Sequence, residues 1–356
     1  MYQLEDNEDI YQKLKDSWIK NYGDNSTYWK EYVSLIASTI EKKGLKDFGT
    51  NRSLSIGFGD ARKTTKSLKI RKYLKFPFLY KILEYLLTIY RYRKNRLVLN
   101  KRKKILWKSI TEKLVFLSNK VNSKTKDLRI NRCIKVNGLE LPWRYLASSL
   151  YLELIQNIIS KYDSNLNLNN FLNGNFLDIG GGYGVMCETV NIFKELFDIR
   201  NTKSYVLEQF PVSYICRQYL DYKSNKNVEI ISQEYEFKNK DSSLGVIQSC
   251  KKNITGLNIS FFFNSNSFQE MDNFIIENYV EFIKNNCSKK SYLGVFLYDS
   301  KKIKSEIYVG PERVTNILEK HFFLIGSLSS KKLSVINNTR FNKNLLMGTL
   351  FIYKVQ

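Results

Sequence analysis

FLDIGGGYG, at Phe176–Gly184, is the stretch that decides the fold of this chain. Its apolar residues predict a short buried strand, with Asp178 near the carboxyl end of that strand. Gly180, Gly182 and Gly184 then permit a tight turn that a ligand can approach closely. A predicted helix follows and points its N-terminus at the same space. Open α/β sheets bind ligands at such strand ends, so we expect a nucleotide-like cofactor here.

The glycine pattern argues against a nicotinamide cofactor. The fingerprint of those enzymes is G-x-G-x-x-G/A, where the helix N-terminus holds a pyrophosphate. Read from Gly180, the last position falls on Val185, and read from Gly182 it falls on Cys187. The chain instead has an acid two residues before the first glycine. The alternative for Asp178 is a helix cap beside a glycine turn.

A second acid, Glu208, ends the second strand, in the segment SYVLEQF, 30 residues after Asp178. A carboxylate there can accept hydrogen bonds from both hydroxyls of a ribose. The alternative is an ordinary surface glutamate at a strand end. Contacts to the base are expected after the third strand, from Gln233 or Glu234.

Strands and helices alternate after Phe171, which predicts a mostly parallel α/β sheet of seven strands closed by an antiparallel C-terminal hairpin. The predicted strands are Phe176–Ile179, Ser204–Leu207, Val228–Ile231, Ile259–Phe263, Tyr292–Leu297, His321–Gly326 and Leu345–Tyr353. The predicted helices between them are Gly184–Leu196, Val212–Leu220, Asp272–Ile283 and Pro311–Glu319.

The first part of the chain has a different pattern. Residues 1–160 show mainly helical periodicity, with a further helix opened by Pro142. The polar, asparagine-rich stretch Asp163–Asn175 follows, and the pattern changes after it. We therefore expect a mainly helical, basic N-terminal region over 1–165 and a Rossmann-like domain over 166–356.

The segments FLDIGGGYG, YVLEQFP and SFFFNSNSFQEMD resemble the sugar O-methyltransferases, a family of class I S-adenosylmethionine (SAM)-dependent methyltransferases. The glycine loop resembles class I enzymes in general, and Asn264–Met271 is more specific to this family. The resemblance covers about residues 142–300. It implies a Rossmann-like methyltransferase sheet that transfers a methyl group from SAM to a sugar hydroxyl of a glycan or glycoconjugate. The residues expected to bind SAM are Asp178, Gly180, Gly181, Gly182, Tyr183, Gly184, Glu208, Gln209, Gln233 and Asn264.

A sugar hydroxyl is a weak nucleophile at neutral pH, so the transfer calls for a general base. Glu270, on the loop after the fourth strand, is the first candidate and Asp299 the second. The alternative for Glu270 is an acid favoured by the N-terminus of the next helix. The single histidine, His321, is expected at the opposite edge of the sheet and is not chosen. The residues expected to bind the acceptor are Asn266, Ser267, Gln269 and Arg144.

Positive charge is concentrated in residues 61–110, which hold 17 Lys or Arg and one acid, Glu84, in a chain of net charge +23. Such a field suits an anionic or lipid-linked acceptor, or peripheral contact with the inner membrane surface. A solvated helix face is the alternative. A nucleic-acid methyltransferase is disfavoured because Asn264–Ser267 replaces the Asp/Asn-Pro-Pro-aromatic run of base aminomethylation. A non-catalytic glycan- or membrane-binding protein is a further alternative.

Other functional classes find little support in the composition. Five separated cysteines without a C-x-x-C pair argue against a disulfide framework or a cysteine-based zinc site. No His-rich or carboxylate cluster has metal-ligand spacing, so no metal is expected. The acidic N-terminus lacks the apolar run of a signal peptide, and a cytoplasmic location is expected.

Overall fold

The computed structural model describes residues 4–20, 27–45, 112, 117, 133–136, 139–224, 228–232, 236–237, 242–248, 254–298, 310–330 and 348–355. Four sequence predictions concern residues outside these ranges: the basic segment 61–110, Gln233, Glu234 and Asp299. None of the helices within these ranges is long and apolar enough to cross a membrane.

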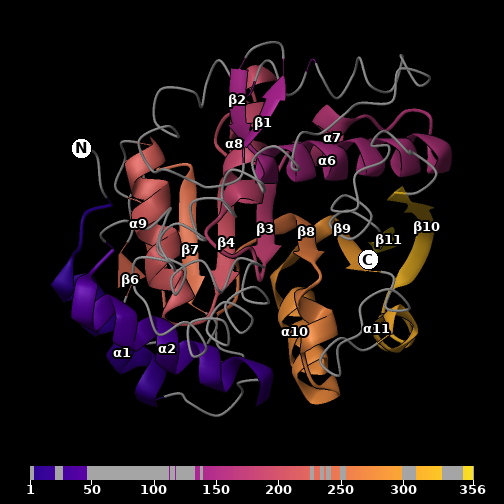
Figure 1. The fold of residues 1–356 in the computed structure, drawn as a ribbon. Coiled ribbons are helices and arrows are strands. Elements are labelled where there is room, and N and C mark those ends of the chain that lie inside the picture. Colours follow the sequence, from indigo (N-terminus) through magenta and orange to yellow (C-terminus); the bar gives the residue numbers. More distant parts are fainter. Residues whose placement is uncertain are drawn as a thin grey trace, which may run out of the picture.

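One mixed sheet organises the described part of the chain (Figure 1). Its strand order is β10-β11-β9-β8-β3-β4-β7-β5-β6, and the six central strands from β9 to β5 run parallel. β11 is antiparallel to both β9 and β10. The strands are β3 Asn175–Ile179, β4 Ser204–Glu208, β5 Glu229–Ile231, β6 Glu236–Phe237, β7 Leu244–Gln248, β8 Ile259–Ser265, β9 Cys287–Tyr298, β10 Phe323–Ser329 and β11 Gly348–Lys354.

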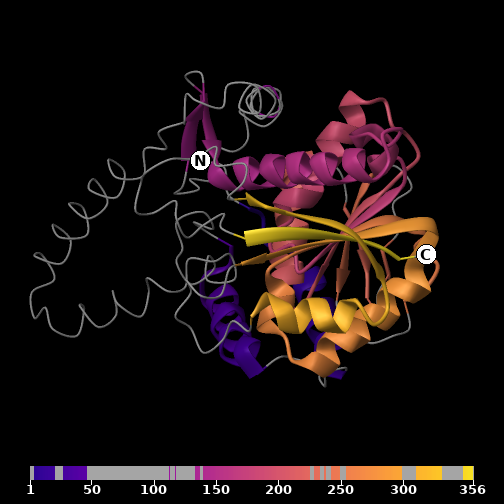
Figure 2. The ribbon, with the colours of Figure 1, turned by 90° about the vertical axis from the view of Figure 1, so that its right-hand side faces the viewer.

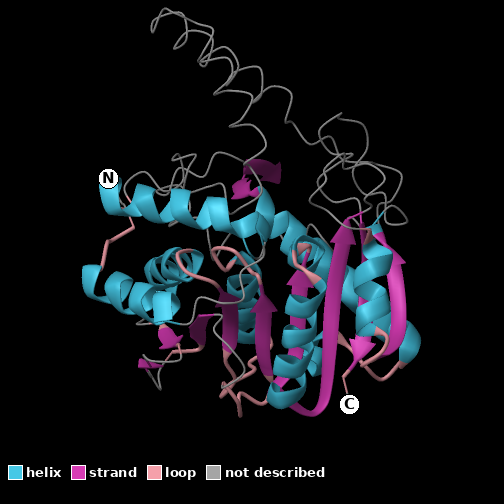
Figure 3. Cartoon of the chain, turned by 90° about the horizontal axis from the view of Figure 1, so that it is seen from below, coloured by secondary structure: helices cyan, strands magenta, loops and turns pink. Residues whose placement is uncertain are grey.

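Alternate residues of the strands face two separate hydrophobic cores, because successive side chains on a strand point to opposite faces. Phe176 and Val206 belong to one core, Leu177 and Leu207 to the other. Figures 2 and 3 show the resulting layers, with helices on both sides of the sheet. The first core is covered by α6 Trp143–Tyr162, α7 Leu168–Leu172, α8 Val185–Leu196 and α9 Val212–Ser224, and the second by α10 Asn273–Asn286 and α11 Pro311–Leu318.

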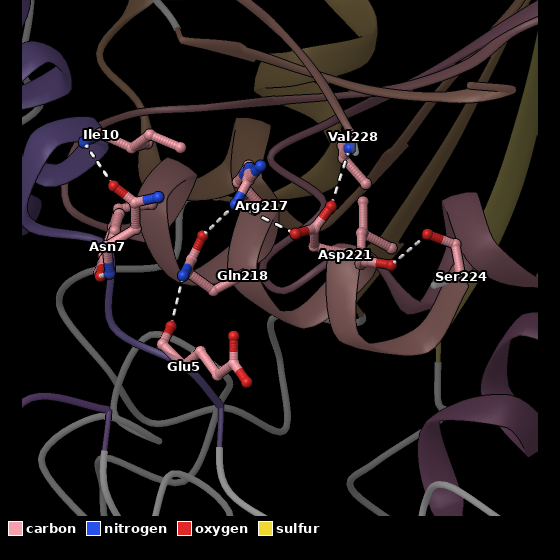
Figure 4. A network of polar contacts seen from close by, with 10 residues as sticks. Glu5, Asn7, Ile10, Arg217, Gln218, Asp221, Ser224 and Val228 are labelled. Atoms are coloured by element: carbon pink, nitrogen blue, oxygen red, sulfur yellow. Dashed lines mark hydrogen bonds and ion pairs between the residues drawn. The ribbon is translucent and has the colours of Figure 1, made fainter. Parts of the chain in front are cut away.

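The N-terminal helices α1 Glu8–Lys20 and α2 Thr27–Lys43 join the first core. The Tyr11 ring lies 5.2 Å from that of Phe210, which begins the turn into α9. A polar network fixes the residues before α1 to α9: Gln218 donates to the Glu5 carbonyl and accepts from Arg217 (Figure 4). The N-terminal segment is therefore packed on the same sheet that carries the glycine turn. The boundary at residue 165 stays a prediction.

The fold prediction is confirmed in its main feature, a mostly parallel sheet with an antiparallel C-terminal pair. The predicted number of seven strands was wrong: the described residues form a sheet of nine. β7 was not predicted because LGVIQ is short and holds a glycine, and β6 has only two residues. β7 matters for the site, because this strand and not β5 lies next to β4. A separate two-stranded hairpin, β1 Cys133–Val136 and β2 Leu139–Pro142, also went unpredicted.

Candidate functional site

The glycine turn between β3 and α8 has the backbone that the sequence requires. Gly180, Gly182 and Gly184 have φ angles of 67°, 63° and 91°. Residues that carry a side chain rarely adopt such positive φ angles. A Cβ atom on Gly180 would lie 2.3 Å from Ser267 Oγ, and one on Gly181 would lie 2.3 Å from Asp178 Oδ2. The turn therefore packs against Ser267 on one side and over the Asp178 carboxylate on the other.

Asp178 is a buried carboxylate, 2% exposed, that accepts no hydrogen bond from any residue the structure describes. It does not cap α8, whose N-cap Gly184 has no side-chain hydrogen bond. Burial raises the pKa of this carboxyl well above its ordinary value, nearby Glu208 raises it further, and Arg144 opposes the rise. A buried acid without a donor is costly, so a ligand with positive charge or N–H groups would stabilise it.

Glu208 ends β4 and clamps the turn. Its Oε1 accepts a hydrogen bond of 2.7 Å from the Gly182 amide, and Oε2 accepts one of 3.3 Å from Gln209. Burial raises the pKa of Glu208 to about 8, against the effect of these two amides, and the charge of Glu270 contributes to the rise. Glu208 keeps part of its surface exposed, so water screens part of this effect. Its carboxylate retains lone pairs for further donors such as a ribose diol.

Gln248 is a site residue that the sequence did not reveal. It ends β7, pairs in register with Glu208, and is fully buried. Its Nε2 donates to the Leu14 carbonyl of α1 at 2.9 Å, while Oε1 has no hydrogen-bond partner among the residues that the structure describes. Because a carbonyl can only accept, this bond also fixes the orientation of the amide. Strand β7 is the sequence feature that could have identified Gln248, and it was not predicted. Contacts to the base were instead expected after β5.

The loop after β8 lies against the end of β3, as predicted, because β8 pairs with β3 in the sheet. Asn264 is fully buried and its Nδ2 donates to the Ile179 carbonyl at 2.9 Å and to Ser267 Oγ. Asn266 has a left-handed backbone, φ 69°, and its buried Oδ1 accepts no hydrogen bond within the described part of the chain. Asn264 thus holds the loop to the glycine turn, whereas Asn266 presents an unsatisfied acceptor.

Two residues predicted in this loop differ in their surroundings. Gln269 is fully buried, and its amide donates to the Tyr298 carbonyl at 3.1 Å and accepts from the Tyr298 amide at 2.7 Å. Both amide atoms thus anchor the loop to the end of β9. Glu270 ends the short helix η2 Ser267–Glu270 and is partly exposed. Its charge acts on Glu208, which places both acids at one edge of the sheet.

Helix α6 brings further groups to this edge. Arg144 lies over the Tyr183 ring, 5.3 Å from the centroid. Tyr151 was not predicted, because nothing in its helical surroundings marks it. It is buried, and its hydroxyl accepts a hydrogen bond of 3.0 Å from Ser265 at the end of β8. Burial raises the pKa of Tyr151, which keeps this phenol protonated.

His321 lies in the turn between α11 and β10, where its Nε2 is 2.8 Å from Glu277 Oε2 of α10. β10 and β9 are both antiparallel to β11, so the start of β10 is at the edge opposite the glycine turn. No group of three or more His, Cys, Asp or Glu suited to a metal occurs within the described ranges.

No protein-family model and no curated protein matches the chain. Similar solved structures include a SAM-dependent methyltransferase from Aquifex aeolicus, with 15% identity, 58% of this chain and 92% of that chain covered, and a TM-score of 0.35. The N-methyltransferase NodS from Bradyrhizobium japonicum WM9 has 11% identity, coverages of 51% and 85%, and a TM-score of 0.35.

A third is geranyl diphosphate C-methyltransferase from Streptomyces coelicolor A3(2), in complex with S-adenosylhomocysteine (SAH). Its identity is 6%, its coverages are 51% and 70%, and its TM-score is 0.35. The sheet of this chain is Rossmann-like, mostly parallel, with the antiparallel strand β11 set between β9 and β10.

Proposed function

We propose that this chain is a SAM-dependent methyltransferase that acts on a sugar hydroxyl. One observation carries the cofactor assignment: the glycine turn has a buried, unpaired carboxylate at one end, Asp178, and a carboxylate with spare acceptors at the other, Glu208. The ammonium of SAM suits the first, and its ribose hydroxyls suit the second. Three successive residues of the turn, Gly180–Gly182, have no side chains.

The charges at this edge favour SAM over a dinucleotide. Asp178, Glu208 and Glu270 are acids, and Arg144 is the cation described beside them. A pyrophosphate would disfavour ionisation of these buried acids still further, whereas the sulfonium and ammonium of SAM would favour their ionised forms. The unpartnered Oε1 of Gln248, next to Glu208, would accept a hydrogen bond from the amino group of adenine.

In the proposed reaction, bound SAM supplies a methyl group on a positively charged sulfur. The protein holds the acceptor oxygen in line with that methyl group, which removes much of the entropic barrier. Glu270 is our candidate for the base that would take the hydroxyl proton as the new C–O bond forms, the methyl C–S bond breaks and SAH leaves. Asp299 remains a predicted alternative. The buried Oδ1 of Asn266 would accept a hydrogen bond from a second hydroxyl of the sugar.

Support for the sugar comes from two sources. Asn264–Met271 resembles the corresponding loop of sugar O-methyltransferases, and this loop lies at the edge that carries the glycine turn. Ser267 and Asn266 add short polar groups suited to hydroxyls. Gln269 would act on the acceptor only by holding the loop, since its amide is bonded to Tyr298.

The test has two steps and uses the full chain. Calorimetry with SAM and SAH checks the cofactor, and a protein that binds neither is not a SAM-dependent methyltransferase. Labelled methyl transfer to fractionated glycans, lipids and nucleic acids then checks the acceptor, with mass spectrometry of the product. Label in nucleic acid alone would overturn the sugar assignment. Binding of SAM without transfer to any fraction would favour a non-catalytic glycan- or membrane-binding role.

A further inference from the structure

Arg144 is held beside the glycine turn by an aromatic contact. Its guanidinium carbon lies 5.3 Å from the centroid of the Tyr183 ring, within the range of a cation–π interaction. Tyr183 belongs to the turn, is 5% exposed, and packs edge-on against Tyr219 at 4.9 Å. Because the ring that supports the guanidinium is itself fixed, the position of the positive charge relative to the turn is fixed as well.

The same guanidinium lies within electrostatic range of Asp178. Its charge lowers the pKa of the Asp178 carboxyl against the effect of burial, and it acts in the same direction on Tyr151. Yet Arg144 and Asp178 do not form a direct ion pair, and the carboxylate accepts no hydrogen bond. A cation on α6 and an anion on β3 therefore face the same turn without neutralising each other by contact.

We propose that Arg144 binds the carboxylate of the cofactor's amino-acid end while Asp178 binds its ammonium, so that the site selects a zwitterionic tail. This inference rests on the proposed function and assigns to the cofactor a residue that the sequence had assigned to the acceptor. An amino-acid tail has both charges on one carbon, so its binding site needs a cation and an anion on adjoining elements. The planar guanidinium suits a carboxylate because it donates two parallel hydrogen bonds.

Two ligands separate this role from a structural one. SAH has the amino-acid tail, whereas 5′-methylthioadenosine keeps the adenosine and the thioether but lacks the tail. We expect Arg144→Ala to weaken SAH binding on the order of 10- to 100-fold, as for a lost charged hydrogen bond, and to change methylthioadenosine binding less than about twofold. Arg144→Lys, which keeps the charge but not the paired donors, should give an intermediate loss.

Arg200→Ala is the matched control, because Arg200 is an exposed arginine paired with Asp198, in the loop between α8 and β4. It should leave the binding of both ligands unchanged. Asp178→Asn should repeat the selective loss of SAH binding, and Glu208→Gln should weaken both ligands because both contain the ribose.

Isothermal titration calorimetry on the full chain measures all five proteins and the unchanged chain. An equal loss of both ligands in Arg144→Ala, or unchanged SAH binding with a raised KM for the acceptor, would overturn the assignment of Arg144. A chain that binds methylthioadenosine as tightly as SAH before any substitution would overturn it too. If the unchanged chain binds neither ligand, the proposed function fails, and the assignment fails with it.

Discussion

The carboxylate of Glu208 and the backbone amide of Gly182 are joined by a hydrogen bond of 2.7 Å. This bond ties the end of β4 to the middle of the glycine turn, between residues 26 positions apart. The acid proposed to hold the ribose therefore also shapes the turn that the cofactor lies against. If Glu208 binds the cofactor as proposed, ligand binding and the local fold of the turn are coupled at this residue.

The first prediction concerns pH. Burial raises the pKa of Glu208 from its ordinary 4.5 to about 8, so the folded chain favours the protonated acid. The stability from this group is fully present below about pH 4.5 and is lost as the pH rises through 8. Glu208→Gln cannot titrate and lacks this contribution. Chemical denaturation of both proteins from pH 4 to 9 should show the unchanged chain losing more stability across that window. Stability profiles that run parallel for the two proteins across this pH range would contradict the prediction.

The second prediction separates backbone strain from collision in the glycine turn. Gly180→Ala places a Cβ at φ 67° and 2.3 Å from Ser267 Oγ. Gly256 also has a positive φ, 80°, but a Cβ there would meet nothing within 4 Å. Both substitutions should cost about 1–2 kcal/mol of backbone strain. Only Gly180→Ala should cost a further ~1–3 kcal/mol and weaken SAH binding. Equal losses of unfolding free energy for the two variants in denaturant melts would mean that the Ser267 side chain moves aside to admit the new Cβ.

The third prediction concerns Asn264, whose buried amide joins β8 to the Ile179 carbonyl. Asn264→Ala should destabilise the chain by about 1–3 kcal/mol and also weaken SAH binding, because the turn loses its support. Asn286 is the control, a buried asparagine bonded to the Ile254 and Phe282 carbonyls at the end of α10. Asn286→Ala should lower the melting temperature similarly and leave calorimetric SAH affinity intact. Loss of SAH affinity in both variants would mean that general destabilisation explains the effect of Asn264→Ala.

The fourth prediction concerns Gln248. Gln248→Met removes the bond to Leu14 but also removes a buried oxygen without a partner. These effects oppose each other, so we expect a stability change within about 1 kcal/mol. Affinity for SAH should nevertheless fall, while affinity for the inosine analogue of SAH, which has no amino group on the base, should change little. A parallel loss of both ligands would show that Gln248 only positions α1.

The sequence predicted the parts of the site whose chemistry is local. Glycines with positive φ and a strand ending in an acid are visible in a few consecutive residues, and the turn and Glu208 lie as expected. Pairings between distant segments were not visible. Gln248 reaches the site because β7 inserts between β4 and β5, and Tyr151 because α6 packs under β8 and β9. Both depend on topology, which periodicity does not encode.

Arg144 illustrates the same limit. The sequence placed it on a helix before the Rossmann-like region and predicted that it binds the acceptor. Its contact with Tyr183 depends on how α6 crosses the sheet, and α6 packs against α8, the helix that starts at the glycine turn. A residue outside the motif thus reaches the motif through helix packing.

The hydrogen bond from Gln248 to the Leu14 carbonyl spans 234 residues of the chain. The side chain proposed to recognise adenine is therefore oriented by a helix made long before β7 leaves the ribosome. Expressing residues 166–356 alone, as the predicted boundary would suggest, would remove that helix along with α6. Such a fragment would expose the aromatic ring of Phe210, now covered by Tyr11 and Trp18, and leave the amide of Gln248 free to rotate. The amino-terminal residues would thus belong to the cofactor pocket itself.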